Sequence, residues 1–199
     1  MPLEISHTPA DQPTTYSLGE YPLLTVGRFS YVDGFVTVFY FSELSPIRIG
    51  NFCSIARNVS FFLRTLHRTD WITQYPLAAM PWPEGVARPE SPHAHGKADI
   101  DIGSDVWIGE GTRFLPGVSV GHGAVIGAGT VVTKNVPPYA LFAGNPGAVR
   151  KSRFAERDVE FLLGLEWWNW PTEKIRRWAP FICSPRIDAL REALEKPGE

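Results

Sequence analysis

The chain has 199 residues, of which 44% are hydrophobic and 20% are charged, as is usual for a soluble globular protein. Its formal net charge of −2 gives no reason to expect nucleic acid or an anionic membrane as a partner. No apolar run approaches the roughly 20 residues of a membrane span, the N-terminus does not resemble a secretory signal, and two distant cysteines suggest no disulfide framework, so we expect a cytoplasmic protein.

Residues 1–24 are polar and turn-rich, and they show no periodicity. They are predicted to form an irregular lead-in packed on the first coil of the structure that follows. From residue 25 onward, large apolar residues recur with a step of six, and small or β-branched residues follow each of them by four places. Cys53 falls in a small slot, so we expect it in the core as a small hydrophobe rather than as a reactive thiol. The first large residues of this ladder are Val26, Val32, Val38, Ile49, Ile55 and Phe61, with a slip of one position near Pro46.

The next large slot falls on His67, where the ladder stops. Residues 67–95 show no step of six and are rich in proline. The separation of His67 from Ile102 is not a multiple of six, so this stretch is predicted to be an excursion loop that leaves the coil and returns. Loops of this length inside a compact fold are usually functional.

Between residues 102 and 136 the step of six is unbroken. Neither a helix nor a single strand has a period of six, whereas a chain that turns a corner every six residues does. The pattern is typical of a parallel β-helix, whose stacked coils bury one continuous core. Residues 25–138 are therefore predicted to form a β-helix domain that is interrupted by loop 67–95. The large slots hold Ile102, Ile108, Phe114, Val120, Ile126 and Val132, and the small slots hold Val106, Thr112, Val118, Ala124, Thr130 and Val136.

Two consecutive prolines, Pro137 and Pro138, cannot both take part in a strand ladder, so the solenoid is predicted to end there. Residues 139–199 are predicted to form a C-terminal tail, with a turn at 144–147, followed by helices. The tryptophan cluster at 167–170 is expected to pack these helices, because aromatic side chains bury a large area.

The position of His67 suggests a catalytic role. It stands where an apolar residue is expected, and an imidazole with a pKa near 6.5 can act as a general base at neutral pH. A structural histidine at the start of a loop is the alternative. His7 and His122 have no supporting context and are assigned to the surface. His93 and His95 share one face of an extended segment, but no third ligand with comparable spacing is visible, and no metal is expected.

Several segments resemble the xenobiotic acetyltransferases, a group of hexapeptide-repeat acyltransferases that includes the streptogramin and chloramphenicol acetyltransferases. The resemblance covers roughly residues 25–180, and the histidine loop together with the tryptophan cluster separates this group from other hexapeptide proteins. The segments that carry it are His-Arg-Thr-Asp-Trp (67–71), Tyr-Pro (75–76), Gly-Ser-Asp-Val-Trp-Ile-Gly (103–109), Val-Val-Thr-Lys-Asn-Val-Pro-Pro-Tyr-Ala (131–140), Gly-Asn-Pro (144–146) and Trp-Trp-Asn-Trp-Pro (167–171).

This resemblance implies a left-handed parallel β-helix and a homotrimer with active sites in the clefts between subunits. It also implies that acetyl-CoA is a co-substrate that lies along the coil edge, with His67 as the catalytic base and Trp107 beside the pantetheine arm. The residues expected at the cofactor are Trp107, Gly109, Gly127, Ala128, Thr133, Lys134, Arg150 and Arg153, and those expected at the acceptor are Tyr31, Asp70 and Trp71.

We therefore expect a CoA-dependent O- or N-acetyltransferase that acts directly on a small molecule, either an antibiotic or a sugar of a polysaccharide or nucleotide-sugar pathway. A catalytically inactive trimeric scaffold is the alternative. It explains the ladder, but not the His67 loop or Lys134. A hexapeptide-fold carbonic anhydrase would need three zinc-binding histidines, and only His67 and His122 occur on ladder segments.

Overall fold

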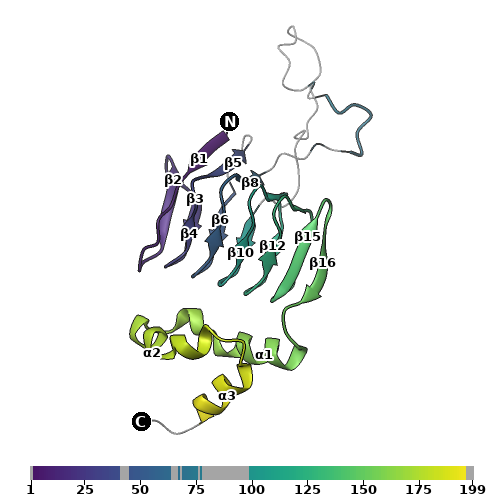
Figure 1. Cartoon of the computed structure of the whole chain (residues 1–199). Coiled ribbons are helices and arrows are strands. Elements are labelled where there is room, and N and C mark those ends of the chain that lie inside the picture. Colours follow the sequence, from purple (N-terminus) through teal and green to yellow (C-terminus); the bar gives the residue numbers. More distant parts are fainter. Residues whose placement is uncertain are drawn as a thin grey trace. The chain divides into compact units, whose positions relative to one another are not determined.

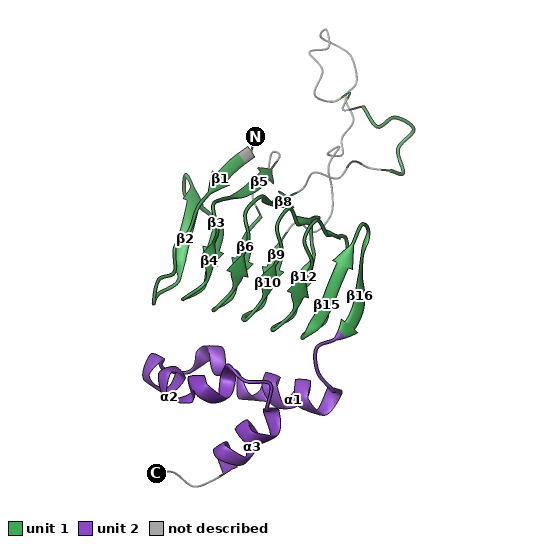
Figure 2. Ribbon diagram, in the orientation of Figure 1, with its two compact units in different colours: residues 1–151 green, residues 152–199 purple. Residues whose placement is uncertain are grey.

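The computed structural model describes residues 2–40, 45–63, 67, 69–75, 77 and 99–195. The chain divides into two compact units, residues 1–151 and 152–199 (Figure 2). The first unit contains the strands and the second contains the helices. The strands are β1 (Pro2–Ile5), β2 (Thr14–Leu18), β3 (Tyr21–Val26), β4 (Tyr31–Val32), β5 (Val36–Tyr40), β6 (Ile47–Ile49), β7 (Ser54–Ile55), β8 (Val59–Leu63), β9 (Ile100–Ile102), β10 (Trp107–Ile108), β11 (Arg113–Phe114), β12 (Ser119–Val120), β13 (Val125–Ile126), β14 (Val131–Val132), β15 (Ala140–Gly144) and β16 (Gly147–Ser152).

The strands form three sheets, and each turn of the chain adds one strand to each sheet (Figure 1). The first sheet has the order β1-β5-β8-β11-β14, the second β16-β15-β13-β10-β7-β4, and the third β12-β9-β6-β3-β2. Within each sheet, strands of successive coils pair in parallel, as β4 does with β7 and β7 with β10. The predicted parallel β-helix is confirmed, and its coils run β3-β4-β5, β6-β7-β8, β9-β10-β11 and β12-β13-β14.

The core of the solenoid is built from the residues in the slots of the six-residue ladder. Phe61 and Phe114 illustrate the stacking from coil to coil, since their rings lie with centroids 5.1 Å apart and planes 15° from parallel. Cys53 is fully buried, as predicted. All twelve slot residues between 102 and 136 are buried: Ile102, Ile108, Phe114, Val120, Ile126, Val132, Val106, Thr112, Val118, Ala124, Thr130 and Val136.

Glycines follow many of the large core residues because neighbouring coils stack closely at the corners. A Cβ atom on Gly103 would lie 2.7 Å from the backbone nitrogen of His122, and one on Gly109 would lie 2.5 Å from that of Ala128. No side chain fits at these distances. The glycine positions of the repeat therefore follow from the spacing between coils rather than from an unusual backbone angle.

The prediction of an irregular lead-in over residues 1–24 was wrong. The lead-in contains β1, β2 and most of β3, and it packs on the first coil, since β1 pairs antiparallel with β5 and β2 pairs antiparallel with β3. Residues 7–10 run beside β4, because the N–H of Val32 donates to the carbonyl of His7 (3.0 Å) and the N–H of Phe29 to that of Ala10 (2.7 Å). These segments cover the otherwise unpaired edge of the first coil, which would be open to pairing with another chain.

The predicted end of the solenoid at Pro137 was also wrong, because a further coil follows. Val136 forms a bridge with Val120, and β15 pairs in parallel with β13. The two prolines are tolerated because they occupy a corner. The N–H and carbonyl of Val136 itself complete the ladder by pairing with Ser119 (2.8 Å) and Gly121 (2.9 Å). The turn expected at 144–147 lies between the neighbouring strands β15 and β16 and contains a cis peptide bond at Asn145–Pro146.

The second unit holds α1 (Glu156–Leu165), a short 3₁₀ turn η2 (Trp167–Asn169), α2 (Thr172–Ile182) and α3 (Ile187–Glu195). Trp168 and Trp170 are buried, and Trp170 lies edge-on to Trp178 with ring centroids 6.2 Å apart. Arg191 of α3 donates to Asp158 of α1 over 3.1 Å, which ties these two helices together. Among the residues that the structure describes, none of the helices has the length and apolar character needed to cross a bilayer.

Candidate active site

A row of side chains crosses the outer face of the second sheet, one from each coil. Their register is continuous, because each residue of the row is paired with the next one. Since neighbouring strands lie about 4.8 Å apart, the row is about 19 Å long. An extended ligand can therefore lie along it and contact one residue in each coil. From the first coil to the last, the row consists of Tyr31, Ser54, Trp107, Val125 and Leu141.

The Tyr31 end of this row opens into a hollow with a volume of about 470 Å³. Tyr31, Ser54 and Trp107 form its floor, and residues 7–9 of the lead-in form part of its wall. Tyr31 and Trp107 are 40% and 58% exposed, so both rings are available to a ligand in the hollow. The structure thus brings together one residue expected at the acceptor and one expected at the cofactor.

The coil corner next to Trp107 presents backbone rather than side chains. Gly109 packs against the backbone of Ala128, and a Cβ atom on Gly127 would lie 3.0 Å from that of Ala143. Ala128 and Gly129 are exposed, and there is open space around the position where a Cβ of Gly129 would lie. A ligand that runs along the row can therefore approach the main chain closely at Gly129. Three of the residues expected at the cofactor, Gly109, Gly127 and Ala128, lie together at this corner.

The basic residues expected at the cofactor lie in different places. The Nε atom of Arg150 donates to the carbonyl of Ala143 over 3.0 Å, which holds the guanidinium at the β15 end of this corner. Thr133 and Lys134 are exposed at a different corner, directly after β14. Arg153 belongs to the second unit, where its guanidinium lies 5.1 Å from the centroid of the Phe154 ring. Arg150 therefore lies beside β15, the strand that carries Leu141, the last residue of the row.

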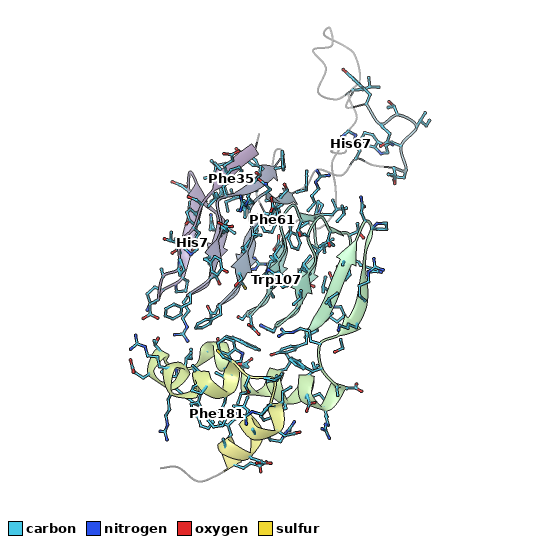
Figure 3. All side chains as sticks on the ribbon, in the orientation of Figure 1. His7, Phe35, Phe61, His67, Trp107 and Phe181 are labelled. Carbon is cyan, nitrogen blue, oxygen red and sulfur yellow. The ribbon has the colours of Figure 1, made fainter. Side chains whose placement is uncertain are left out.

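His67 is exposed on the excursion segment (Figure 3), and its Nδ1 atom lies 2.8 Å from the carbonyl oxygen of Gln74. A carbonyl only accepts hydrogen bonds, so Nδ1 carries the proton and, in the neutral ring, Nε2 carries the lone pair. The expected acceptor residues Asp70 and Trp71 belong to the same short segment. His67 is not one of the described residues that line the hollow. His93 and His95 lie outside the described residues.

Two histidines assigned to the surface have structural roles instead. The Nδ1 atom of His122 accepts a hydrogen bond from the N–H of Ser104 over 2.8 Å, one of a series of side-chain contacts that join successive coils at this corner. His7 is only 7% exposed and lies in the wall of the hollow. The surface assignment of His7 was wrong because its burial depends on the antiparallel lead-in, which leaves no trace in the six-residue ladder.

Comparison with known proteins places this arrangement in context. Residues 99–134 match the family model described as bacterial transferase hexapeptide (six repeats). The chain is 39% identical over 183 residues to a chloramphenicol acetyltransferase of Escherichia coli, a match that covers 85% of this chain and 86% of that protein. It is 44% identical over 128 residues to a probable macrolide acetyltransferase of Lysinibacillus sphaericus, covering 64% of this chain and 71% of the relative.

Similarity extends to solved structures. A hexapeptide-repeat acetyltransferase of Vibrio cholerae, solved in complex with acetyl-coenzyme A, superimposes with a TM-score of 0.53 at 25% sequence identity. The superposition covers 67% of this chain and 62% of the Vibrio protein.

Proposed function

Because this chain belongs to the hexapeptide-repeat acetyltransferases, in the group of the chloramphenicol acetyltransferases, we propose that it transfers the acetyl group of acetyl-CoA directly to a hydroxyl or amine of a small molecule, with His67 as general base. The chain is an acetyl-CoA-dependent acyltransferase, since its relatives are named acetyltransferases and a similar solved structure holds acetyl-coenzyme A. The identity of the base, the geometry of the site and the acceptor class form the proposal.

The observation that carries the proposal is the contact between His67 and the Gln74 carbonyl (2.8 Å). A general base needs an imidazole nitrogen with a lone pair, held in a fixed orientation. The carbonyl fixes the Nδ1–H tautomer and leaves the lone pair on Nε2. His67 would take the proton from the acceptor as its oxygen or nitrogen attacks the thioester carbonyl, and would then pass this proton to the departing thiolate of CoA.

A direct transfer also needs a hydrogen-bond donor for the negative charge that develops on the thioester oxygen. We assign this role to a backbone N–H at the coil corner that contains Ala128, because Ala128 and Gly129 are exposed there and a Cβ on Gly129 would meet open space. The N–H groups of Gly109 and Gly127 already donate to carbonyls of the next coil over 2.8 and 2.9 Å. No covalent enzyme intermediate is required. Cys53, the cysteine within the coils, is fully buried, which supports direct transfer.

The row on the second sheet is where the cofactor would bind. Its length of about 19 Å suits an extended pantetheine arm, and the exposed indole of Trp107 offers an apolar surface to that arm. Arg150, held at the far end by Ala143, offers a cation for a phosphate of CoA. The acceptor would then occupy the hollow at the Tyr31 end of the row.

We propose further that the coils are left-handed and that the active site forms between subunits of a trimer. The proposed base and the proposed acceptor hollow lie apart in one chain, which supports this assembly. His67 is not one of the described residues lining the hollow that holds Tyr31 and Trp107. In the trimer, His67 of one subunit would face the hollow of its neighbour. Asp70 and Trp71, on the same segment as His67, would contact the acceptor there.

The acceptor is an antibiotic with an acylatable hydroxyl or amine, or a sugar of a polysaccharide or nucleotide-sugar pathway. Relatives named for chloramphenicol and for macrolides support the antibiotic class. A thiol-release assay with acetyl-CoA tests this proposal on chloramphenicol, macrolides, streptogramins and amino- and hydroxy-sugars. Acetylation of at least one of them that is lost in His67→Ala is the expected result. Acetylation that persists in His67→Ala would contradict the base assignment, and acetylation of none of them would contradict the acceptor class.

A further inference from the structure

Asp33 lies beside Tyr31 on the outer face of the second sheet, and both residues line the hollow. Tyr31 and Asp33 are exposed while Val32 between them is buried, so their side chains leave the sheet on the same side. The N–H of Asp33 donates to the carbonyl of Ile55 over 2.8 Å, which ties this position to the next coil. The Asp33 side chain is 65% exposed, so a ligand in the hollow can reach its carboxylate.

Asp33 gives the hollow a negative charge. His7 is the other described lining residue that could carry a charge near neutral pH, and burial lowers its pKa, which keeps the ring neutral at pH 7. The guanidinium of Arg57 lies 3.7 Å from the Asp33 carboxylate, but it is 61% exposed and also lies 4.0 Å from Glu110. In this group one guanidinium faces two carboxylates, so the charge of Asp33 is only partly offset.

The opposite end of the same face carries a cation. The residues that directly follow the paired strand positions lie in register along the sheet, and they are Asp33, Ala56, Gly109, Gly127 and Ala143. Asp33 and Ala143 are therefore about 19 Å apart, and Arg150 donates to the carbonyl of Ala143 over 3.0 Å. A cofactor with a phosphate at Arg150 would keep its negative charge away from Asp33, which leaves this carboxylate to the acceptor.

The aromatic rings next to Asp33 also suit a cation. Tyr31 and Trp107 flank Ser54 in the row, and both rings are open to the hollow. Strands two coils apart are separated by about 10 Å, and an aromatic face attracts a cation within about 6 Å of its centre. A cation held over Ser54 would therefore lie within range of both rings. A neutral hydroxyl would gain from the carboxylate but not from the rings.

We infer that Asp33 binds a protonated amine of the acetyl acceptor, with Tyr31 and Trp107 beside it, and so selects basic acceptors over neutral ones. This inference rests on the proposed function, which puts the acceptor in the hollow. The bound amine is separate from the group that becomes acetylated, because an ammonium nitrogen has no lone pair with which to attack the thioester. The acceptor class narrows to alcohols that also carry a basic amine, such as amino sugars and antibiotics that contain them.

Two probes of the same shape test this inference, erythromycin and its N-oxide. The dimethylamino group of erythromycin is protonated at pH 7, whereas the N-oxide carries no net charge. Isothermal calorimetry on the native protein with millimolar CoA measures both dissociation constants without turnover. We expect wild type to bind erythromycin about fivefold more tightly than the N-oxide, and Asp33→Asn to bind the two alike. Equal binding of the two probes by wild type would overturn the inference, and so would no binding of erythromycin at millimolar concentration.

Arg57 and Glu110 provide matched controls. Arg57→Gln removes the cation that competes for the Asp33 carboxylate, so it should tighten erythromycin binding about twofold or more. If the ion pair were only structural, Asp33→Asn and Arg57→Gln would weaken the binding of both probes alike, and the inference would be overturned.

Glu110→Gln removes the same charge as Asp33→Asn, from a residue that is not among the described ones lining the hollow. Its preference for erythromycin should stay within about twofold of wild type. A loss as large as that in Asp33→Asn would show that the total charge, rather than Asp33, sets the preference.

The proposed function is tested separately by thiol release. That assay shows whether acetyl-CoA is consumed with erythromycin, whereas calorimetry shows whether Asp33 binds the amine. Binding that depends on Asp33 without any acetylation would support the amine site and contradict the proposed acceptor class. Acetylation of erythromycin with an unchanged KM in Asp33→Asn would support the proposed function and overturn the role of Asp33.

Discussion

The Nδ1 atom of His67 lies 2.8 Å from the carbonyl oxygen of Gln74, and this contact closes a short turn at the start of the excursion. The partner is a main-chain atom, so the tautomer of the ring depends on the conformation of the turn rather than on the identity of a side chain. A base oriented by backbone tolerates substitution of its neighbours better than one oriented by a carboxylate.

Replacing His67 by alanine should lower kcat by about a hundredfold or more, the usual scale for loss of a general base. The KM for acetyl-CoA should change little, because the row on the second sheet is untouched. Steady-state thiol release measures both constants. Gln74→Ala is the matched control, since it keeps the backbone carbonyl and should keep most of kcat. Near-normal turnover in His67→Ala would remove His67 from the mechanism.

Trp107→Ala should raise the KM for acetyl-CoA about tenfold. The loss of an aromatic surface that becomes buried on binding costs about 1.5 kcal/mol or more, and Trp107 is 58% exposed in the isolated chain. Isothermal calorimetry with CoA measures the same loss without turnover. Tyr21→Ala removes a comparably exposed aromatic residue (65%) from the third sheet and serves as the control. Equal affinities in the two variants would exclude the row as the cofactor site.

Arg150→Ala should weaken acetyl-CoA binding about tenfold or more, because a hydrogen bond from a charged group contributes about 1.5–3 kcal/mol. It should have little effect on acetyl-dephospho-CoA if the lost contact is with the 3′-phosphate. Lys134→Ala and Arg153→Ala, assayed in parallel with both thioesters, show which cation makes this contact. If only Lys134→Ala bound the two thioesters equally well, the 3′-phosphate would lie at the corner after β14, which carries Lys134.

The two cysteines should differ sharply in reactivity. Burial raises the pKa of the Cys53 thiol to about 12, whereas Cys183 is exposed. At pH 8 a disulfide reagent should therefore modify one thiol per native chain, and the second only after denaturation, because the thiolate is the reactive form. Cys183→Ser should abolish the native reaction. Rapid modification in that variant would show that Cys53 is accessible.

The pH dependence of stability should include a contribution from His7. Its pKa in the folded protein is lowered by burial from the ordinary 6.5, so the folded state binds fewer protons than the unfolded state just below pH 6.5. The stabilisation is complete above about pH 6.5 and is lost as the pH falls from there through the lowered pKa. Thermal unfolding from about pH 5 to 8 should show a shallower decline for His7→Gln than for wild type. Parallel curves would mean that His7 titrates alike in both states.

The solenoid could be predicted from the sequence alone, because a repeat of six residues marks each corner of the coils. Every large slot from Ile102 to Val132 is buried, and so is Cys53 in its small slot. The ladder could not show the lead-in strands, since antiparallel pairing with β3 and β5 follows a period of two over only four or five residues. It also misplaced the end of the solenoid, because a proline pair breaks a strand but not a corner.

The candidate site was predicted in part. The row from Tyr31 to Leu141 could be predicted, because the six-residue ladder gives the register of successive coils. The structure adds that Tyr31 and Trp107 line one hollow. The burial of His7 depends on its contacts with Tyr16 and with Val32 of β4, and no spacing in the sequence encodes them. In the proposed trimer, the relation of His67 to the hollow would depend on a neighbouring subunit, so one sequence could suggest it only through resemblance.

The excursion leaves the stack after β8 and returns at β9, yet the coils on either side pair as though it were absent: β6 with β9, and β8 with β11. The register of the coils is therefore continuous across the excursion. A graft between two enzymes of this kind could exchange the whole segment from residue 64 to residue 98 and keep the row from Tyr31 to Leu141 in register. Such an exchange would replace the segment that carries His67, Asp70 and Trp71 of the proposed acceptor site, in a scaffold that keeps its register.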